Sequence, residues 1–190
     1  MSSFRNHIRL YQVALQLVLL LLVAVAGERA VAQYEDNGFH VRVGEGSSIT
    51  THGSRSVFLS LPKRRLAGGD TSPVVFVDQN VALCEERNRL DFIMGVAPMV
   101  QLELAHDIPR LTIEGGIGVN IVSSREMDGR QLGSNFLFSP TVSAGIELPW
   151  MKGLLGVFYM FRHLSNAGMF RDNDGVNFQY IVFSMSFKTY

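Results

Sequence analysis

A histidine and a serine stand two residues apart near the end of the chain, where an apolar, strand-like run stops. They are His163 and Ser165, in the stretch Phe161–Gly168. Successive side chains of a β-strand point to opposite faces, so both residues should project from the same side. Because an imidazole can take the proton of a neighbouring hydroxyl, this pair is the minimal arrangement for nucleophilic acyl transfer. The spacing is that of an acyl-transfer site on one face of a strand, and the alternative is a coincidental pair of polar residues where the strand ends.

The elements that must position this pair are strands, because apolar and polar residues alternate with a period of two in the second half of the chain. The alternating segments are 111–123, 136–148 and 176–187. Each has an aliphatic and aromatic face opposite a face of Ser, Thr, Gly, Asn and a few acids. Their length exceeds the usual soluble strand of about 5–6 residues and suits a tilted membrane strand of about 9–11.

An apolar outer face with a polar inner face is typical of a transmembrane barrel. The fold class predicted here is therefore all-β, an eight-stranded antiparallel transmembrane β-barrel. In the first half the strand candidates are 38–43, 56–61, 74–80 and 90–104, with Pro98 allowing one bent strand or two short ones. Lys63-Arg64-Arg65 is expected to lie in a loop. The alternative is a soluble periplasmic or secreted barrel that binds a hydrophobic ligand inside.

The amino terminus is typical of a cleavable export signal. Arg5 and Arg9 precede the apolar run 13–26, and a small-x-small site ends at Ala32. The predicted domains are a signal peptide, residues 1–32, and a barrel, residues 33–190. The apolar run is shorter than the roughly 18 residues of a spanning helix, and an uncleaved anchor is the other possibility.

The composition bears on the partners that the protein could bind and on whether disulfide bonds could stabilise it. The chain has 17 basic and 17 acidic residues, which argues against a nucleic acid as partner. The single cysteine, Cys84, cannot form an internal disulfide and is expected to be a small buried residue. His40, His52 and His106 show no metal-ligand spacing.

The alternation also places the polar cluster on the barrel wall. His163 and Ser165 continue the outward row that contains Val157 and Tyr159. Counting back along the final strand places Asn177 on the same outward face, next to His163 across the hairpin. Polar groups on a lipid-facing wall are costly, and a substrate that is itself a lipid would explain them. The loop 166–175 should then be extracellular.

The block from His163 to Gly168, followed by Asn173 to Asn177, resembles the signature of the PagL lipid A 3-O-deacylases, and weaker similarities extend upstream to about residue 90. The resemblance implies an outer-membrane barrel hydrolase that releases a 3-hydroxy fatty acid from lipid A, the lipid anchor of lipopolysaccharide. It implies Ser165 as nucleophile, His163 as general base, and Asn166 with the backbone near Ala167 and Gly168 as oxyanion stabilisers. It implies no metal or organic cofactor, and it leaves the oligomeric state open, a homodimer included.

The chain departs from the family pattern at position 177, where the family has a glutamate and this chain has Asn177. An amide can fix the histidine tautomer but cannot stabilise the imidazolium as a carboxylate does. Asp172 or Asp174 would supply a carboxylate if the adjoining loop folded back. The alternative function is a catalytically silent barrel with a structural or binding role.

Charged residues predicted on inward faces are expected to pair inside the barrel. They are Glu114, Glu147 and Arg162. The glycine run 115–118 lies within a predicted strand and is better explained by close packing of a curved sheet than by phosphate binding.

Overall fold

The computed structural model describes residues 38–49, 53–60, 64–67, 73–105, 108–151 and 153–188. These residues belong to one compact unit, Gly38–Tyr190. The predicted signal peptide, residues 1–32, lies outside the described residues. None of the described residues forms a helix long and apolar enough to cross a membrane.

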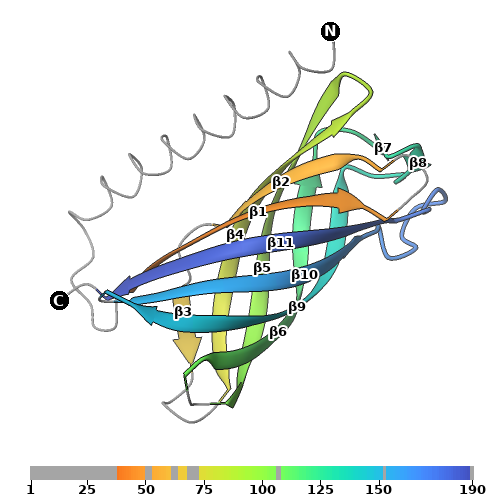
Figure 1. Ribbon diagram of the computed structural model, residues 1–190. Coiled ribbons are helices and arrows are strands. Elements are labelled where there is room, and N and C mark those ends of the chain that lie inside the picture. Colours follow the sequence, from red (N-terminus) through yellow and green to blue (C-terminus); the bar gives the residue numbers. More distant parts are fainter. Residues whose placement is uncertain are drawn as a thin grey trace, which may run out of the picture. The chain divides into compact units, whose positions relative to one another are not determined.

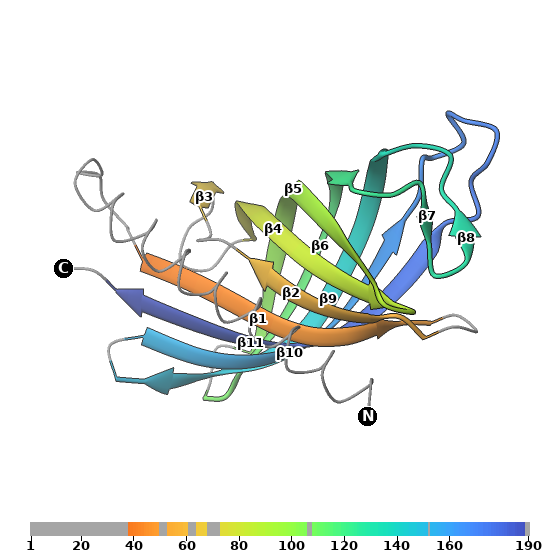
Figure 2. The ribbon, with the colours of Figure 1, turned by 90° about the horizontal axis from the view of Figure 1, so that it is seen from above.

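The described residues form an antiparallel sheet that closes on itself (Figures 1 and 2). Its strands run in the order β2-β1-β11-β10-β9-β6-β5-β4-β3, and the pairing of β2 with β4 closes an eight-stranded barrel. The bounds are β1 Gly38–Ser48, β2 Arg55–Ser60, β3 Arg64–Ala67, β4 Val74–Glu86, β5 Arg89–Ala105, β6 Arg110–Val122, β9 Phe136–Trp150, β10 Gly153–Leu164 and β11 Val176–Lys188. A separate small hairpin joins β7 (Glu126–Met127) to β8 (Arg130–Gln131). The predicted fold class is confirmed.

The short strand β3 corrects one sequence-based expectation. Arg64 and Arg65 belong to β3, which pairs with the first residues of β4, whereas β2 pairs with Asn80–Glu85. Along the edge of β4, β3 therefore continues the direction of β2. The charge of the Lys63-Arg64-Arg65 run indicated a loop, but a charged side chain does not prevent backbone pairing at a strand end.

Strand β5 is one element rather than two. Its ladder with β6 skips Ala97 and Pro98 and resumes in the same register at Met99. Because proline has no N–H, it is tolerated where a ladder hydrogen bond is missing. A Cβ at Gly116 would collide with the Pro98 carbonyl, so glycine is required for β6 to approach this point.

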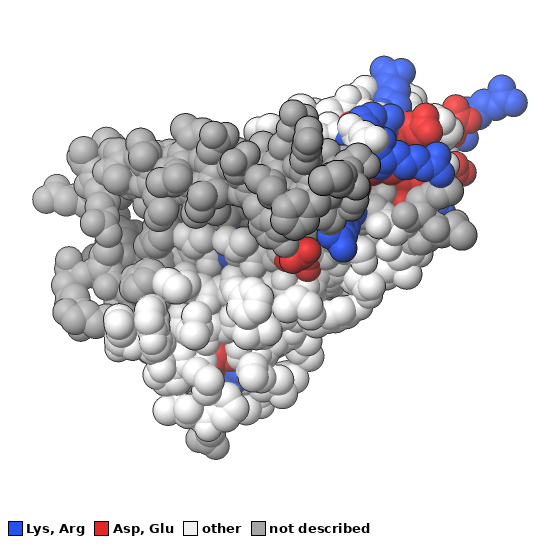
Figure 3. All heavy atoms as spheres, turned by 45° about the horizontal axis from the view of Figure 1, so that its top comes forward, with Lys and Arg blue, Asp and Glu red and all other residues white. Residues whose placement is uncertain are grey.

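The two faces of the barrel wall have the predicted polarity. The exposed face of the long strands is aliphatic and aromatic, with Ile117 62%, Ile121 60% and Phe183 59% exposed. The interior holds buried polar groups, among them Thr112, Asn120, Ser139, Ser143 and Ser184. In the face shown in Figure 3, charged side chains gather mainly toward one end and the described wall is nearly free of them. This is the polarity of a transmembrane barrel.

Inside the barrel, the ion pair differs from the predicted one. Arg42 on β1 donates two hydrogen bonds to Glu114, both of 2.6 Å, and Ser143 donates a third of 3.1 Å. Arg162 instead donates to Asn120. Glu114 and Asn120 are six residues apart on β6, about 20 Å along a strand, so one guanidinium cannot reach both.

One end of the barrel carries the elements that matter for the site, and it is called the loop end below. It holds the connections 123–135 and 166–175 and the two-residue turn Arg87–Asn88, where both residues have positive φ. The buried side chains of Met127 and Leu132 join the apolar cluster inside the barrel. The 123–135 connection thus folds inward over the barrel end (Figure 2).

Candidate active site

Strands β10 and β11 bring the predicted histidine and amide together. His163 and Asn177 are directly opposite each other in the antiparallel register. His163 Nδ1 lies 2.6 Å from Asn177 Oδ1. The backbone of Asn177 is held in turn, because its carbonyl accepts a hydrogen bond of 2.9 Å from the Ile49 N–H.

This hydrogen bond determines which ring nitrogen can act as a base. A carbonyl oxygen only accepts, so Nδ1 carries the hydrogen of this bond, and in the neutral ring Nε2 then holds the lone pair. In a serine hydrolase triad the orienting group likewise binds Nδ1, and Nε2 takes the serine proton. The contact is thus compatible with a neutral His163 ring that carries its hydrogen on Nδ1, which is the tautomer that a general base would need.

Ser165 lies one residue beyond β10 and is fixed by β9. Its backbone exchanges two hydrogen bonds with Phe138, of 2.7 and 3.1 Å. Ser165 and His163 are both half-buried and lie on the outward row of β10. Among the described residues no hydrogen bond joins the Ser165 hydroxyl to the imidazole; in apo structures such bonds are often long and tighten only with substrate.

Asn166 turns inward from the site and organises the loop. Its buried side chain donates to the carbonyls of Leu132 and Asp172, at 2.9 and 2.7 Å, and accepts from Gly168 N–H at 2.9 Å. The predicted oxyanion role of Asn166 stays a prediction. In this arrangement both Nδ2 hydrogens already have partners.

The turn after Asn166 exposes a backbone donor. Ala167 and Gly168 have φ of 55° and 77°, and Met169 N–H closes the turn onto the Asn166 carbonyl at 3.1 Å. A positive φ at an alanine is strained, and such strain is found most often at functional sites. Within the described part of the chain, the exposed Ala167 has no hydrogen bond on its N–H.

Gly175 packs against the histidine ring. It has a φ of 61°, and a Cβ built there would lie 2.7 Å from His163 Cε1 and 3.2 Å from Nε2. Sequence reasoning missed this contact, although a glycine just before the final strand was a signal for it. Asp174, considered as a substitute acid, instead accepts a hydrogen bond from Gln131 N–H at 3.0 Å.

The wall beside Ser165 is apolar on the β9 side. Phe136 and Phe138 point outward and make an edge-to-face contact, with ring centroids 5.5 Å apart. Their partners on β6, Ile121 and Val119, are exposed as well. The described residues contain no group of three or more His, Cys, Asp or Glu able to hold a metal ion. The arrangement is that of an imidazole and a hydroxyl beside a surface suited to hydrocarbon.

Comparison with known proteins bears on the family and the fold of the chain. A curated relative, the lipid A deacylase PagL of Pseudomonas aeruginosa PAO1, is 34% identical over 83 residues, which are 44% of this chain and 46% of that protein. The matched stretch thus spans about half the length of that relative.

Two solved structures share the fold. The crystal structure of the outer membrane enzyme PagL has a TM-score of 0.62 at 23% identity, covering 75% of this chain and 97% of that one. That of Neisserial surface protein A has a TM-score of 0.52 at 8% identity, covering 80% and 96%. The family model for lipid A 3-O-deacylase (PagL) matches residues 30–186. The chain therefore belongs to the PagL family of lipid A 3-O-deacylases.

Proposed function

We propose that this chain is an outer-membrane serine esterase that removes the 3-O-linked hydroxyacyl chain of lipid A. The observation that carries the proposal is the 2.6 Å contact between His163 Nδ1 and Asn177 Oδ1, next to Ser165 on the lipid-facing wall. It leaves Nε2 free to act as a base where a lipid ester can reach it. Membership of the deacylase family supports the substrate class.

The proposed reaction begins with attack of Ser165 Oγ on the ester carbonyl carbon, while His163 Nε2 takes the hydroxyl proton. The tetrahedral intermediate collapses by breaking the bond to the sugar 3-oxygen, which receives that proton. Water then attacks the acyl-serine by the same route. The products are a 3-hydroxy fatty acid and lipid A with a free 3-hydroxyl, and Ser165 is restored.

The developing oxyanion needs a fixed donor. We assign this role to the Ala167 N–H, since the side chain of Asn166 already donates to two carbonyls and the Gly168 N–H donates to Asn166. Asn166 then contributes by holding the turn that aims this donor. The reaction as proposed requires neither metal nor organic cofactor.

The orientation in the membrane follows from the ends of the chain. β11 runs away from the loop end, so if the carboxyl terminus is periplasmic, as in eight-stranded barrels, the loop end faces outward. The site then lies at the outer leaflet, where lipopolysaccharide resides. Phe136 and Phe138 offer an apolar surface for an acyl chain beside Ser165.

A catalytically silent barrel is the second candidate. Two observations favour it: an amide at position 177, and no hydrogen bond between Ser165 and His163, both described residues. A silent barrel would bind lipid A without changing it.

Incubating the purified barrel with lipid A separates the two candidates. We expect a mass loss equal to one hydroxyacyl chain, abolished in Ser165→Ala. The control is Ser184→Ala, which removes an inward-facing hydroxyl from β11 and should retain activity. Unchanged lipid A with a folded wild-type barrel, or equal activity in Ser165→Ala, would rule out the serine esterase.

A further inference from the structure

The histidine ring is held on its base-bearing edge by a glycine rather than by a side chain. Gly175 lies so close that a Cβ would come within 2.7 Å of His163 Cε1. The other ring nitrogen, Nδ1, is in contact with Asn177 Oδ1. The position of the ring therefore depends on two elements: the side chain of Asn177 and the backbone at Gly175.

The backbone at Gly175 is itself held by the β7–β8 hairpin. Arg130 Nη1 lies 3.0 Å from the carbonyl of Asp174 and 3.3 Å from that of Gly175. Gln131 exchanges backbone contacts with Asp174: its carbonyl accepts from Asp174 N–H at 3.0 Å, and its own N–H donates to the carboxylate at 3.0 Å. These contacts join two connections that are far apart in sequence.

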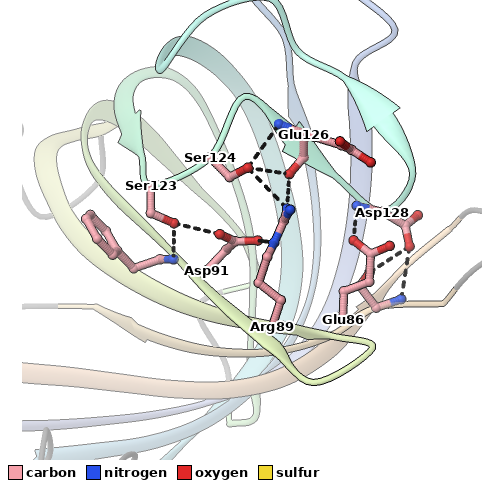
Figure 4. Close-up of polar contacts among 9 residues, drawn as sticks. Glu86, Arg89, Asp91, Ser123, Ser124, Glu126 and Asp128 are labelled. Carbon is pink, nitrogen blue, oxygen red and sulfur yellow. Dashed lines mark hydrogen bonds and ion pairs between the residues drawn. The ribbon is translucent and has the colours of Figure 1, made fainter.

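The hairpin is anchored at its other side to the barrel rim (Figure 4). Glu86, at the end of β4, accepts a hydrogen bond of 2.6 Å from Asp128 N–H. Arg89 on β5 contacts Ser124 Oγ at 3.1 Å and also donates to the carbonyl of Glu126. A salt bridge of 2.7 Å to Asp91 holds the Arg89 side chain in place.

Apolar burial strengthens this anchorage. Met127 in β7 and Leu132, the residue after β8, are 1% and 0% exposed and pack in the barrel's apolar cluster. The hairpin thus has contacts both with the β4–β5 side of the rim and with the segment next to the histidine.

From these contacts we propose that the β7–β8 hairpin is a positioning element for the general base. Arg130 acts as its key residue by fixing the Gly175 carbonyl. This inference rests on the proposed esterase function and extends it to residues outside the Ser165–His163–Asn177 group. Arg130 does not touch the reacting atoms; it acts through Gly175 on the direction of Nε2.

The first test compares Arg130→Ala, Arg130→Lys and Arg125→Ala. Arg125 is the matched control, because it is exposed on the same connection and donates to Asn135 within it, at 2.9 Å. A small misplacement of a catalytic group costs up to about 100-fold in rate, so Arg130→Ala should lower kcat on lipid A by roughly 10- to 100-fold. Since lipid contacts are unchanged, KM should stay within about 2-fold.

Lysine keeps a donor but not the guanidinium fork, so Arg130→Lys should recover part of kcat. Arg125→Ala should resemble wild type. Equal kcat for wild type and Arg130→Ala overturns the positioning role. So does a loss that appears only in KM, because that would place Arg130 in substrate binding.

A spectroscopic readout keeps the proposal testable if the barrel proves inactive. The Nδ1 proton of His163, bound at 2.6 Å, should give a downfield NMR signal that is absent in His163→Gln. We expect this signal to broaden or vanish in Arg130→Ala and in Gly175→Ala, and to persist in Arg125→Ala. An unchanged signal in Arg130→Ala overturns the positioning role, whereas failure of the proposed function appears separately, as wild type inactive on lipid A.

Discussion

At the scale of the residue, the candidate site has an amide, Asn177, where a serine hydrolase triad has an acid. The side chain of Asn177 accepts the Nδ1 hydrogen of His163 and so orients the ring, which is one of the two roles of the acid in a triad. It brings no negative charge to stabilise the imidazolium that the proposed attack of Ser165 would form. In a serine protease, replacing the acid by its amide costs about 10⁴-fold in turnover, mainly through the wrong tautomer. Since the proposed mechanism has the hydrogen on Nδ1 of His163, a smaller deficit is expected here.

Asn177→Asp tests this point directly. Aspartate has the same shape and places a carboxylate oxygen where Oδ1 now lies, so we expect kcat to hold or to rise by about 10-fold. Asn177→Leu keeps the size but removes the acceptor, and should lower kcat by about 100-fold. Steady-state kinetics on lipid A with each variant measures both. A clear loss in Asn177→Asp would show that the site does not operate as a triad.

At the scale of the element, the loop 166–175 depends on one buried amide. The side chain of Asn166 joins three backbone groups, those of Leu132, Asp172 and Gly168. Period-two alternation placed Ser165 and His163 on the outward face correctly. It could not reveal these contacts, because a loop has no period and its partners lie far away in sequence. The same limit hid the contacts of Arg130 with Asp174 and Gly175.

Asn166→Ala should loosen this loop without opening the barrel. Each unsatisfied buried carbonyl costs about 1–3 kcal/mol, so the loop should unfold locally before the sheet does. Limited proteolysis should then cut within residues 167–174 faster than in wild type. The mobility of the folded barrel on unheated gels should not change. Equal cleavage rates would mean that Asn166 does not hold the loop.

At the scale of the whole molecule, the polarity of the wall decides where the site lies. The outward row of β11 includes Ile181 and Phe183, 47% and 59% exposed, and leads to Asn177 at the loop end. The hairpin register made this placement predictable from sequence. The interior pairing was not predictable, because which inward charges meet depends on strand tilt and stagger around the closed barrel. In the structure Arg42, and not the expected Arg162, forms the ion pair with Glu114.

Phe183→Arg should destabilise the barrel in lipid. A cation on the lipid face costs about 2–4 kcal/mol at the bilayer midplane and about 0–1 kcal/mol near the interface. The matched control is Phe136→Arg, which changes the same residue type near the loop end. Denaturant unfolding in vesicles measures the difference. Equal stabilities would contradict the placement of β11 across the membrane.

Glu114→Gln should destabilise the interior. Arg42 is 6% exposed and holds its charge against Glu114 in the barrel. Breaking a buried pair by removing one charge costs about 3–5 kcal/mol, because the other charge stays uncompensated. Denaturant unfolding in vesicles measures this loss of stability. The control is Glu126→Gln, which changes an exposed glutamate. A cost below that of the control would show that the interior pair is dispensable.

The most direct test of the account is deacylation of lipid A in water enriched in ¹⁸O. Attack by Ser165 on the carbonyl carbon, followed by hydrolysis, predicts one ¹⁸O in the released 3-hydroxy fatty acid and none in the sugar 3-hydroxyl. Ser165→Ala should release no acid. Intact lipid A after incubation with the folded wild-type barrel, ¹⁸O in the sugar product, or release by Ser165→Ala would contradict it.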